Sequence, residues 1–293
     1  MVVIKLEGGL GNQMFQYAFA SILAKKNKSS IKIDKDFFDL TKKTQGFTPR
    51  NFELDIFDNS YLIASQSDIG SLTQLSFSNK IRRKLGIYES KIFYEPTFDF
   101  HPDALSIKAP VYVKGYFQSY KYLIGYEDLI RETFVFPIGT LNNTNKELLL
   151  HLKTKTTIAI HIRRGDYITN KLTQQFHGNC SLEYYLEAIS LLTSRNKDFT
   201  LIFFSDDNIW VKEKFENLPY PKIFVDHNKN ENSWKDMCLM SSCTHNIIAN
   251  SSFSWWAAWL NGNPNKIVIA PKLWYAEVEK NTNDLIPPQW IRL

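Results

Sequence analysis

The chain has 293 residues, a formal net charge of +5, and 44% apolar and 14% aromatic residues. This length and composition support a hydrophobic core in one large or two ordinary domains and exclude the disordered class. The three cysteines, odd in number and irregularly spaced, fit neither a disulfide framework nor a zinc site, and the positive charge favours anionic partners.

The first elements along the chain alternate between strand and helix. The predicted segments are a strand at 2–6, a glycine-rich turn at 7–12, a helix to about residue 26 and a strand at 30–34. This order is typical of a parallel α/β unit. Residues 40–110 favour neither element, because proline, asparagine and short aromatic runs interrupt the periodicity.

The second half of the chain alternates strands and helices throughout, as a doubly wound sheet does. Its predicted strands lie at 156–162, 200–204, 222–225, 246–249 and 266–270, and its helices at 181–194, 233–243 and 253–261. Turn-forming residues mark 137–146 as a linker. We therefore expect an α/β fold of two Rossmann-like domains facing a central cleft, formed by residues 1–150 and 151–293, with the joint near 140–155.

Four polar segments directly follow predicted strands. They are EGGLGNQ (7–13), HIRRGD (161–166), SDD (205–207) and NSS (250–252). Ligands of open α/β sheets bind beyond the carboxyl ends of the strands, so these segments are the candidate sites.

Arg163 and Arg164 lie where an anion would bind at such a strand end. A planar guanidinium can hold two phosphate oxygens at once. The alternative for either arginine is a structural ion pair with Asp166. Asp206 and Asp207 follow the next strand, where one of them could pair with Arg163 and fix its side chain. We do not expect them to bind a metal, because their spacing differs from the DxD motif of other sugar-nucleotide enzymes.

Two further segments favour either helix capping or ligand binding. Ser251 and Ser252 open a helix whose N–H groups and hydroxyls could cradle a phosphate, or they serve as an ordinary N-cap. Asp236 stands three residues after Ser233, which is the spacing of a capping box. Its carboxylate could instead accept two hydrogen bonds, from N1–H and the 2-amino group of guanine.

The glycine-rich turn has two alternatives besides a plain tight turn. It could be a dinucleotide fingerprint with Asp34 as the ribose-binding acid, although Met14 stands where the third glycine is needed. A second ligand could instead approach the backbone of the turn, contacting Gly9, Gly11, Asn12 and Gln13. The other candidates for chemistry, His177, His227 and His245, have no partner at ligand spacing and are expected to be ordinary histidines.

The segments GGLGNQMFQYA, GYFQSYKY, HIRRGDY, FFSDD and NSSFSWWAAWLN follow one another in the order seen in a known family. Together they resemble the α-1,2-fucosyltransferases of glycosyltransferase family 11, over nearly the whole chain. The resemblance implies a glycosyltransferase B fold with the donor, GDP-L-fucose, in the C-terminal domain. It implies inverting, metal-independent transfer of fucose to the 2-hydroxyl of a terminal galactose on an oligosaccharide or lipid-linked glycan, without a cofactor.

The same resemblance implies roles for individual residues. Arg163 is similar to the arginine that holds the β-phosphate, and Asn12 to an asparagine near the reacting sugar. Lys171 stands where related α-1,6 enzymes have a proposed catalytic glutamate, so Asp166 is the candidate base here. The predicted catalytic set is Arg163, Asp166 and Asn12. The predicted donor-binding set is His161, Arg163, Arg164, Ser205, Asp206, Asp236, Ser251, Ser252 and Phe253, and the acceptor-side set is Gly9, Gly11, Asn12 and Gln13.

Two other functions are compatible with these segments. One is a non-catalytic sugar-nucleotide or glycan-binding module of the same fold, and the other is an NAD-dependent enzyme built on the glycine turn.

No signal peptide or membrane-spanning stretch is recognisable, so a cytoplasmic protein is expected. The basic run KIRRK (80–84) is either a solvated face or a peripheral contact with a membrane or another anionic partner. Nucleic acid is not an expected partner, and the sequence carries no signal for an oligomeric state.

Overall fold

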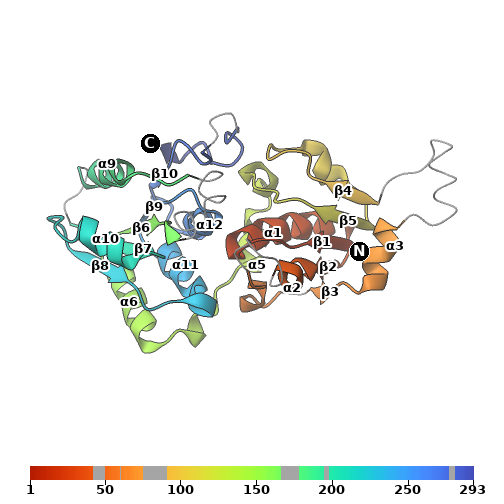
Figure 1. The fold of residues 1–293 in the computed structure, drawn as a ribbon, viewed down its shortest axis with the longest axis horizontal. Helices are drawn as coiled ribbons and strands as arrows, with labels where there is room; N and C mark the ends of the chain where they lie inside the picture. Colours follow the sequence, from red (N-terminus) through yellow and green to blue (C-terminus); the bar gives the residue numbers. More distant parts are fainter. Residues whose placement is uncertain (42–49, 60, 75–90, 166–177, 195–197, 277–280) are drawn as a thin grey trace. The chain divides into compact units, whose positions relative to one another are not determined.

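The structure is a computed structural model that describes residues 1–41, 50–59, 61–74, 91–165, 178–194, 198–276 and 281–293. It consists of two compact units, Met1–Val135 and Phe136–Leu293, and each has a parallel sheet with helices packed on it (Figure 1). None of the described helices is long and apolar enough to cross a bilayer.

The two units divide earlier in the sequence than the predicted boundary at residue 150. The segment 137–146, predicted as a linker, contains a 3-10 turn and the beginning of helix α6 (Asn143–Thr154). Helix α6 packs on helix α11 (Trp234–Ser241) and therefore belongs to the second unit. Its first residues read as a turn because Asn142 is the N-cap, with its side chain accepting a hydrogen bond from the backbone of Asn145.

The first unit has a five-stranded sheet in the order β3-β2-β1-β5-β4, and all of its described strand pairs are parallel. The strands are β1 (Val2–Lys5), β2 (Ile31–Asp34), β3 (Leu62–Ile63), β4 (Ile92–Tyr94) and β5 (Val111–Lys114). The predicted first two strands are confirmed. The last three were not predicted, because proline, asparagine and short aromatic runs interrupt the periodicity of the segment that contains β3 and β4, and β5 follows directly after it.

Helix α1 (Leu10–Asn27) is the central helix of the first unit; the predicted helix is confirmed, but it begins at Leu10, within the segment 7–12 that was predicted as a turn. It is buried on most sides, and the ring of Phe19 stacks on that of Phe117 with centroids 3.9 Å apart. The shorter helices α2 (Asp36–Thr41), α3 (Gln66–Thr73) and α5 (Glu127–Thr133) complete the unit.

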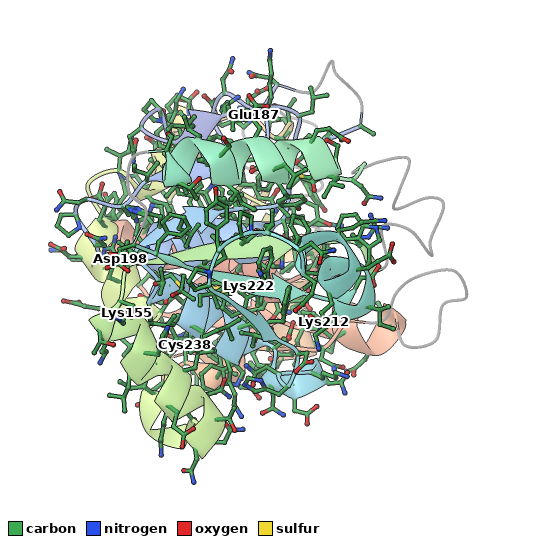
Figure 2. All side chains as sticks on the ribbon, turned by 90° about the vertical axis from the view of Figure 1, so that its left-hand side faces the viewer. Lys155, Glu187, Asp198, Lys212, Lys222 and Cys238 are labelled. Atoms are coloured by element: carbon green, nitrogen blue, oxygen red, sulfur yellow. The ribbon has the colours of Figure 1, made fainter. Side chains whose placement is uncertain are left out.

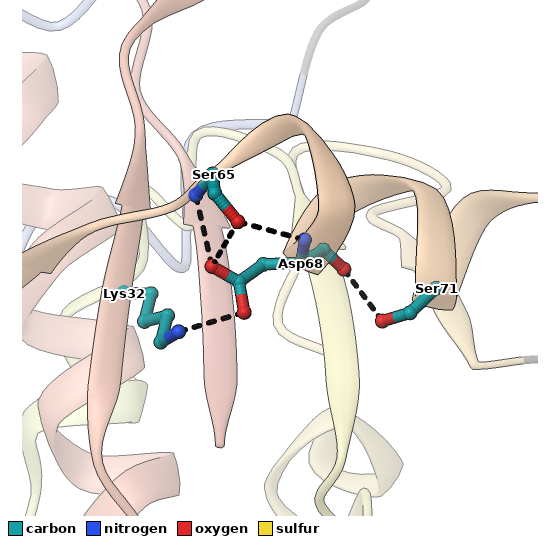
Figure 3. Close-up of polar contacts among 4 residues, drawn as sticks. All are labelled: Lys32, Ser65, Asp68 and Ser71. Carbon is teal, nitrogen blue, oxygen red and sulfur yellow. Dashed lines mark hydrogen bonds and ion pairs between the residues drawn. The ribbon is translucent and has the colours of Figure 1, made fainter.

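The start of α3 shows how one of these short helices is fixed to the sheet (Figure 3). The Ser65 hydroxyl accepts from the Asp68 N–H at 3.1 Å, and the Asp68 carboxylate accepts from the Ser65 N–H at 2.9 Å. Lys32 of β2 donates to the same carboxylate at 2.7 Å, and this bond, with those from Ser65, lowers the pKa of Asp68 to about 2. The capping box therefore also joins α3 to its neighbouring strand.

The second unit has a six-stranded sheet in the order β11-β10-β9-β6-β7-β8, and all of its described strand pairs are parallel. The strands are β6 (Thr157–Ile162), β7 (Thr200–Ser205), β8 (Lys222–Val225), β9 (His245–Ile247), β10 (Val268–Ala270) and β11 (Ile291–Arg292). The chain proceeds from β6 to one edge and then returns to β9 on the other side of β6. The point where the order reverses, between β6 and β9, is where ligands of such sheets bind.

One face of this sheet is covered by α9 (Leu182–Thr193) and α10 (Asn208–Phe215). Their apolar side chains pack on those of Ile160, Phe203 and Ile247. The predicted N-cap of α9 is confirmed, since the Ser181 side chain accepts from the Tyr184 N–H. Figure 2 shows α9 with Glu187 on one side of the strands and α11 with Cys238 on the other.

The opposite face carries the alternate residues of β6, Ala159 and His161. Asn246 of β9 is in register with Ala159, and its side chain donates to the carbonyl of Met240 in α11 at 2.9 Å. Asn261, which ends helix α12 (Ser252–Leu260), donates to the same Asn246 side chain at 2.8 Å. His161 therefore lies on the face that α11 and α12 cover.

Candidate active site

The carboxyl ends of β6 and β9 lie side by side, with Ile160 in register with Ile247. β6 leads into Arg163 and Arg164, and β9 leads into the first turn of α12. The ring of His161 lies 5.7 Å from that of Phe253 in this first turn. The structure thus brings the predicted segments HIRR and NSSF together where the strand order reverses.

Arg163 is held by Asp206 at the end of the neighbouring strand β7. Its Nη1 lies 2.8 Å from Asp206 Oδ2, and the other oxygen of this carboxylate accepts from the Arg164 N–H at 2.8 Å. A Cβ on Gly165 would lie 2.7 Å from Asp206 Oδ2, so the close approach requires glycine there. The predicted pairing of Arg163 with an aspartate of SDD is confirmed. Asp206 anchors Arg163 and Arg164, which we call the arginine loop, through both carboxylate oxygens.

Arg164 is fixed in a different way. Its guanidinium carbon lies 3.9 Å above the centre of the Trp210 ring, and its Nε donates to Asp207 Oδ2 at 3.2 Å. The other oxygen of Asp207 accepts from the Trp210 N–H and caps α10. Stacking and ion pairing together orient the planar group. Trp210 was not predicted as part of the site, and neither was the helix α10 that carries it.

Ser205, predicted to bind the donor, ties two strands together instead. Its hydroxyl donates to the carbonyl of Ile162 at 2.8 Å and accepts from the Asp207 N–H at 2.9 Å. Both bonds hold the ends of β6 and β7 in place. Ser205 therefore stabilises the strand ends that carry Arg163 and Asp206.

His161 is buried and electrically neutral in the folded protein. Only 7% of the residue is exposed, and burial lowers the pKa of its imidazole to about 4. No described residue makes a hydrogen bond to the buried Nδ1. Buried polar atoms are normally paired, so an unpaired ring nitrogen beside Phe253 is typical of a ligand-binding position.

The N-terminus of α12 is not capped by a serine side chain, so the capping interpretation of Ser251 is wrong. The hydroxyl of Ser254, deeper in the helix, donates to the carbonyls of Ala249 and Ser251 instead. Ser251, Ser252 and Phe253 are half-buried beside the arginine loop. The N–H groups of this turn form the positive end of the helix dipole.

Asp236 is not part of a capping box either. The Ser233 side chain caps nothing, and the Asp236 carboxylate accepts from Asn228 Nδ2 at 2.7 Å. Burial raises the pKa of Asp236 to about 7, and the bond from Asn228 opposes this shift. A carboxyl group with this pKa is divided between its neutral and charged forms near neutral pH, which is common in functional sites.

In the first unit, Gly8 is the glycine that the turn after β1 requires. Its φ is +82°, and a Cβ there would lie 2.5 Å from Asn12 Nδ2. Gly9, by contrast, has an extended backbone, and its nearest neighbour to an added Cβ, Glu53, is 4.0 Å away. Asn12 is half-buried and accepts from Gln118 Nε2 at 2.8 Å. Gln118 lies in the predicted motif GYFQSYKY, but its role there was not predicted.

The turn that carries Gln118 is held by Glu95, which follows β4. The carboxylate accepts from the N–H groups of Tyr116 at 2.7 Å and Phe117 at 3.0 Å. Burial raises the pKa of Glu95 to about 7 despite these two bonds. The ends of β1, β4 and β5 are thus connected from Glu95 through Gln118 to Asn12.

Gln13 and Asp34 are both committed to internal contacts. Gln13 is fully buried, donates to the carbonyls of Gly8 and Asn51, and accepts from the Glu53 N–H. Gln13 therefore holds the turn. The prediction that it contacts an acceptor is wrong, because its side chain is not exposed. Asp34 is 4% exposed and accepts from the Tyr112 hydroxyl at 2.6 Å, which leaves it unsuited to bind a ribose and removes support for the NAD-dependent alternative.

Several predicted features lie outside the described residues. They are Asp166, Lys171, His177 and the basic run 80–84. Within the described part of the chain, no group of three or more His, Cys, Asp or Glu side chains could hold a metal ion.

The whole chain, residues 1–293, matches the model of glycosyl transferase family 11. The protein belongs to this family. An O-antigen biosynthesis glycosyltransferase, WbnK, from Escherichia coli is 36% identical over 98% of this chain and 99% of its own. An alpha-1,2-colitosyltransferase from Escherichia coli is 34% identical over 100% and 99% of the two chains. A galactoside alpha-(1,2)-fucosyltransferase 1 from Lagothrix lagotricha is 28% identical over 38% of this family 11 chain and 30% of its own.

The fold of this family 11 glycosyltransferase is shared with solved fucosyltransferases. An Arabidopsis thaliana FUT1 mutant in complex with GDP has a TM-score of 0.51 at 15% identity, covering 91% of this chain and 69% of its own. POFUT1 in complex with GDP has a TM-score of 0.51 at 12% identity, covering 92% and 97%. The predicted family and the predicted glycosyltransferase B type of fold, with two parallel-sheet α/β domains, are confirmed.

Proposed function

We propose that this glycosyltransferase transfers L-fucose, with inversion, from GDP-L-fucose to the 2-hydroxyl of a terminal galactose in a glycan acceptor. The whole-chain family match and the α-1,2 linkage named for two relatives support the reaction class. The full-length relative that transfers colitose favours one second candidate, a colitose donor at the same site. Colitose lacks the 3-hydroxyl group of fucose, so the two donors differ only at C3 of the sugar and share the same nucleotide.

The observation that carries this proposal is Arg163, which Asp206 anchors just beyond β6, the strand next to the one that leads into α12. The diphosphate gains negative charge as its bond to the sugar breaks, so stabilisation is needed at the leaving group. The ion pair with Asp206 holds the Arg163 side chain in one orientation before the donor binds. Such preorganised donors lower the barrier because they need little rearrangement during the reaction.

His161 and Asp236 are assigned to the guanosine part of the donor. The neutral imidazole of His161 has a buried Nδ1 without a described partner, which suits a hydroxyl or N–H group of the ligand. The carboxylate of Asp236 suits two adjacent N–H donors, as guanine offers. Both side chains lie on or beside the face covered by α11 and α12.

Two further roles complete the proposal. The acceptor hydroxyl must lose its proton to a base, for which Asp166 is the candidate. Asn12, held by Gln118, is the proposed contact near the reacting sugar. No cofactor has a role in this proposal.

The test is to incubate the protein with GDP-fucose and lactose, measure GDP release with and without the acceptor, and determine the linkage of the product. Acceptor-dependent release and an α-1,2-linked fucose support the proposal. Turnover of GDP-colitose but not of GDP-fucose would replace the donor, and tight GDP binding without turnover of either would favour a binding module. Absence of both binding and turnover would reject the proposed function.

A further inference from the structure

A chain of amide side chains connects helix α6 to Asp236. Asn145 of α6 is fully buried, and its Nδ2 donates to Asn142 Oδ1 and Asn228 Oδ1, both at 2.8 Å. Its Oδ1 accepts from Asn228 Nδ2 and His227 Nε2, both at 2.9 Å. Asn228 then donates its second Nδ2 hydrogen to Asp236 Oδ1 at 2.7 Å. We call Asn142, Asn145, Asn228 and Asp236 the amide chain.

The direction of every bond in the amide chain is determined by the helix cap. Asn142 Oδ1 accepts from the backbone N–H of Asn145, so this atom must be the oxygen of the amide. Asn145 must then point its own Nδ2 at Asn142, because two oxygens facing each other would repel. The Oδ1 of Asn145 consequently accepts from Asn228 Nδ2. The second hydrogen of the same Nδ2 is then donated to Asp236 Oδ1. No amide in the chain can be turned over without losing at least two hydrogen bonds.

Asn145 and Asn228 use all of their side-chain donor hydrogens. Each has two donor hydrogens, and all four are placed on oxygens. Turning either amide over would break several of these bonds at once, which restricts the movement of both side chains. The carboxylate at the end of the amide chain is therefore held by a bond whose donor is restricted in its movement.

The backbone around Asp236 is fixed independently of the amide chain. Trp234, the first residue of α11, is 7% exposed and its ring stacks on that of Phe136 at 6.2 Å and an interplanar angle of 10°. The helix behind it packs on α12. Loss of an amide would therefore release the Asp236 side chain without displacing the start of α11.

We propose that Asn145 and Asn228 are positioning residues that fix the plane of the Asp236 carboxylate, so that it selects a nucleobase with two adjacent N–H donors. This inference rests on the proposed function, in which Asp236 binds the base of the donor. Asn228 acts directly on the carboxylate, and Asn145 acts through Asn228. The selected edge is that of guanine, which presents N1–H and the 2-amino group together.

The prediction is tested by comparing GDP with inosine diphosphate, whose base keeps N1–H but lacks the 2-amino group. Calorimetric Kd values for both ligands give a GDP preference for each variant. A well-oriented bidentate contact discriminates by on the order of 10–100-fold, and we expect this preference in the unaltered protein. Asn228→Ala and Asn145→Ala should each reduce it to within about 3-fold, mainly by weakening GDP binding.

Asn143→Ala is the matched control, because Asn143 is exposed on the same helix two residues from Asn145. It should leave the GDP preference unchanged. The double variant Asn145→Ala/Asn228→Ala should be no less selective than Asn228→Ala, because the two residues act in series. If Asn145→Ala fails to fold, Asn228→Ala alone decides, since Asn228 lies in a loop and is only half-buried.

The outcomes separate this inference from the proposed function. An unaltered protein that binds neither nucleotide would reject the proposed donor and this inference with it. A protein that prefers GDP, and whose Asn145 and Asn228 variants keep that preference while melting at lower temperature, would overturn the inference alone. The amide chain would then serve only to pack α6 on α11.

Discussion

At the scale of single residues, the site depends on side chains that are oriented before a ligand arrives. Arg163 bonds Asp206 and Arg164 stacks on Trp210, so two adjacent arginines are fixed by different means. Sequence reasoning located both arginines because charge at a strand end is unusual. It could not locate Trp210, since its role depends on a contact across 46 residues that no local pattern reveals.

Two substitutions of Arg163 distinguish the effect of its positive charge from that of its planar guanidinium group. Arg163→Ala should lower kcat by on the order of 10²–10³, as the loss of one preorganised leaving-group contact does. Arg163→Lys should recover little, because an ammonium group cannot hold two phosphate oxygens and the Asp206 carboxylate in one plane. Steady-state kinetics with saturating donor measure both effects. Lys212→Ala, which removes an exposed ion pair in the same unit, is the control, and near-normal kcat in Arg163→Ala would contradict the role.

The raised pKa of Asp236 predicts how nucleotide affinity depends on pH. Burial raises the pKa to about 7, and the base should bind the charged carboxylate. GDP affinity should therefore increase with pH and level off above about 7, falling by up to about 10-fold per unit below it. Titrations between pH 5.5 and 8.5 should show this, and Asp236→Asn should remove the part of the pH dependence that does not come from GDP itself.

The same group has the opposite effect on stability without a ligand. A carboxyl whose pKa is higher in the folded than in the unfolded chain keeps its proton longer in the folded state. Its contribution to the free energy of unfolding is therefore present below about pH 4 and is lost as pH rises towards about 7. If thermal melts of the unliganded protein and of Asp236→Asn do not diverge across this range, Asp236 is less buried than the structure shows.

At the scale of elements, most of the second unit was predicted because its central strands are strongly apolar, but helix α10 and the short strand β11 were not predicted. β6, β7 and β8 lie within a residue of their predicted bounds. Strands β3 and β4 of the first unit were not predicted, and the start of α6 was misread because its N-cap and first turn have the composition of a loop. An asparagine-rich segment fits the composition of a loop and also that of a helix N-terminus. Only the packing of α6 on α11 decides between the two.

The turn between β1 and α1 allows a matched test of two neighbouring glycines. Gly8→Ala places a Cβ at φ +82° and within 2.5 Å of Asn12, so it should destabilise the fold by about 1–3 kcal/mol. Gly9→Ala has an extended backbone and open space, so its effect should stay within about 0.5 kcal/mol. Denaturant midpoints measure the difference. Equal effects would show that the turn does not need a left-handed residue at position 8.

At the scale of the whole molecule, the residues proposed to bind the donor and those proposed to contact the acceptor belong to different units. Every described residue assigned to the donor lies between Phe136 and Leu293, and Asn12 with its support lies in Met1–Val135. Each unit has its own sheet, and each sheet reverses its strand order beside its first strand, β1 or β6. The resemblance to family 11 implied this division, but the predicted boundary lies within α6.

The position of that boundary can be tested with two fragments. A fragment of residues 136–293 contains the complete six-stranded sheet and all of α6, so it should fold and bind GDP. A fragment of residues 151–293, cut at the predicted boundary, loses the buried Leu148 and the amide chain up to Asn145. The buried leucine alone contributes about 1.5–3 kcal/mol, so the shorter fragment should melt at lower temperature.

Nucleotide selectivity separates the loss of packing from the loss of the amide chain in these fragments. The longer fragment should prefer GDP to inosine diphosphate as the full chain does, because its Asp236 is held in the same way. The shorter one, if it folds at low temperature, should bind both nucleotides alike. Circular dichroism and calorimetry measure folding and preference in the same samples. Equal stability and equal GDP preference in the two fragments would show that the domain boundary lies within α6, as predicted from the sequence, and not before it.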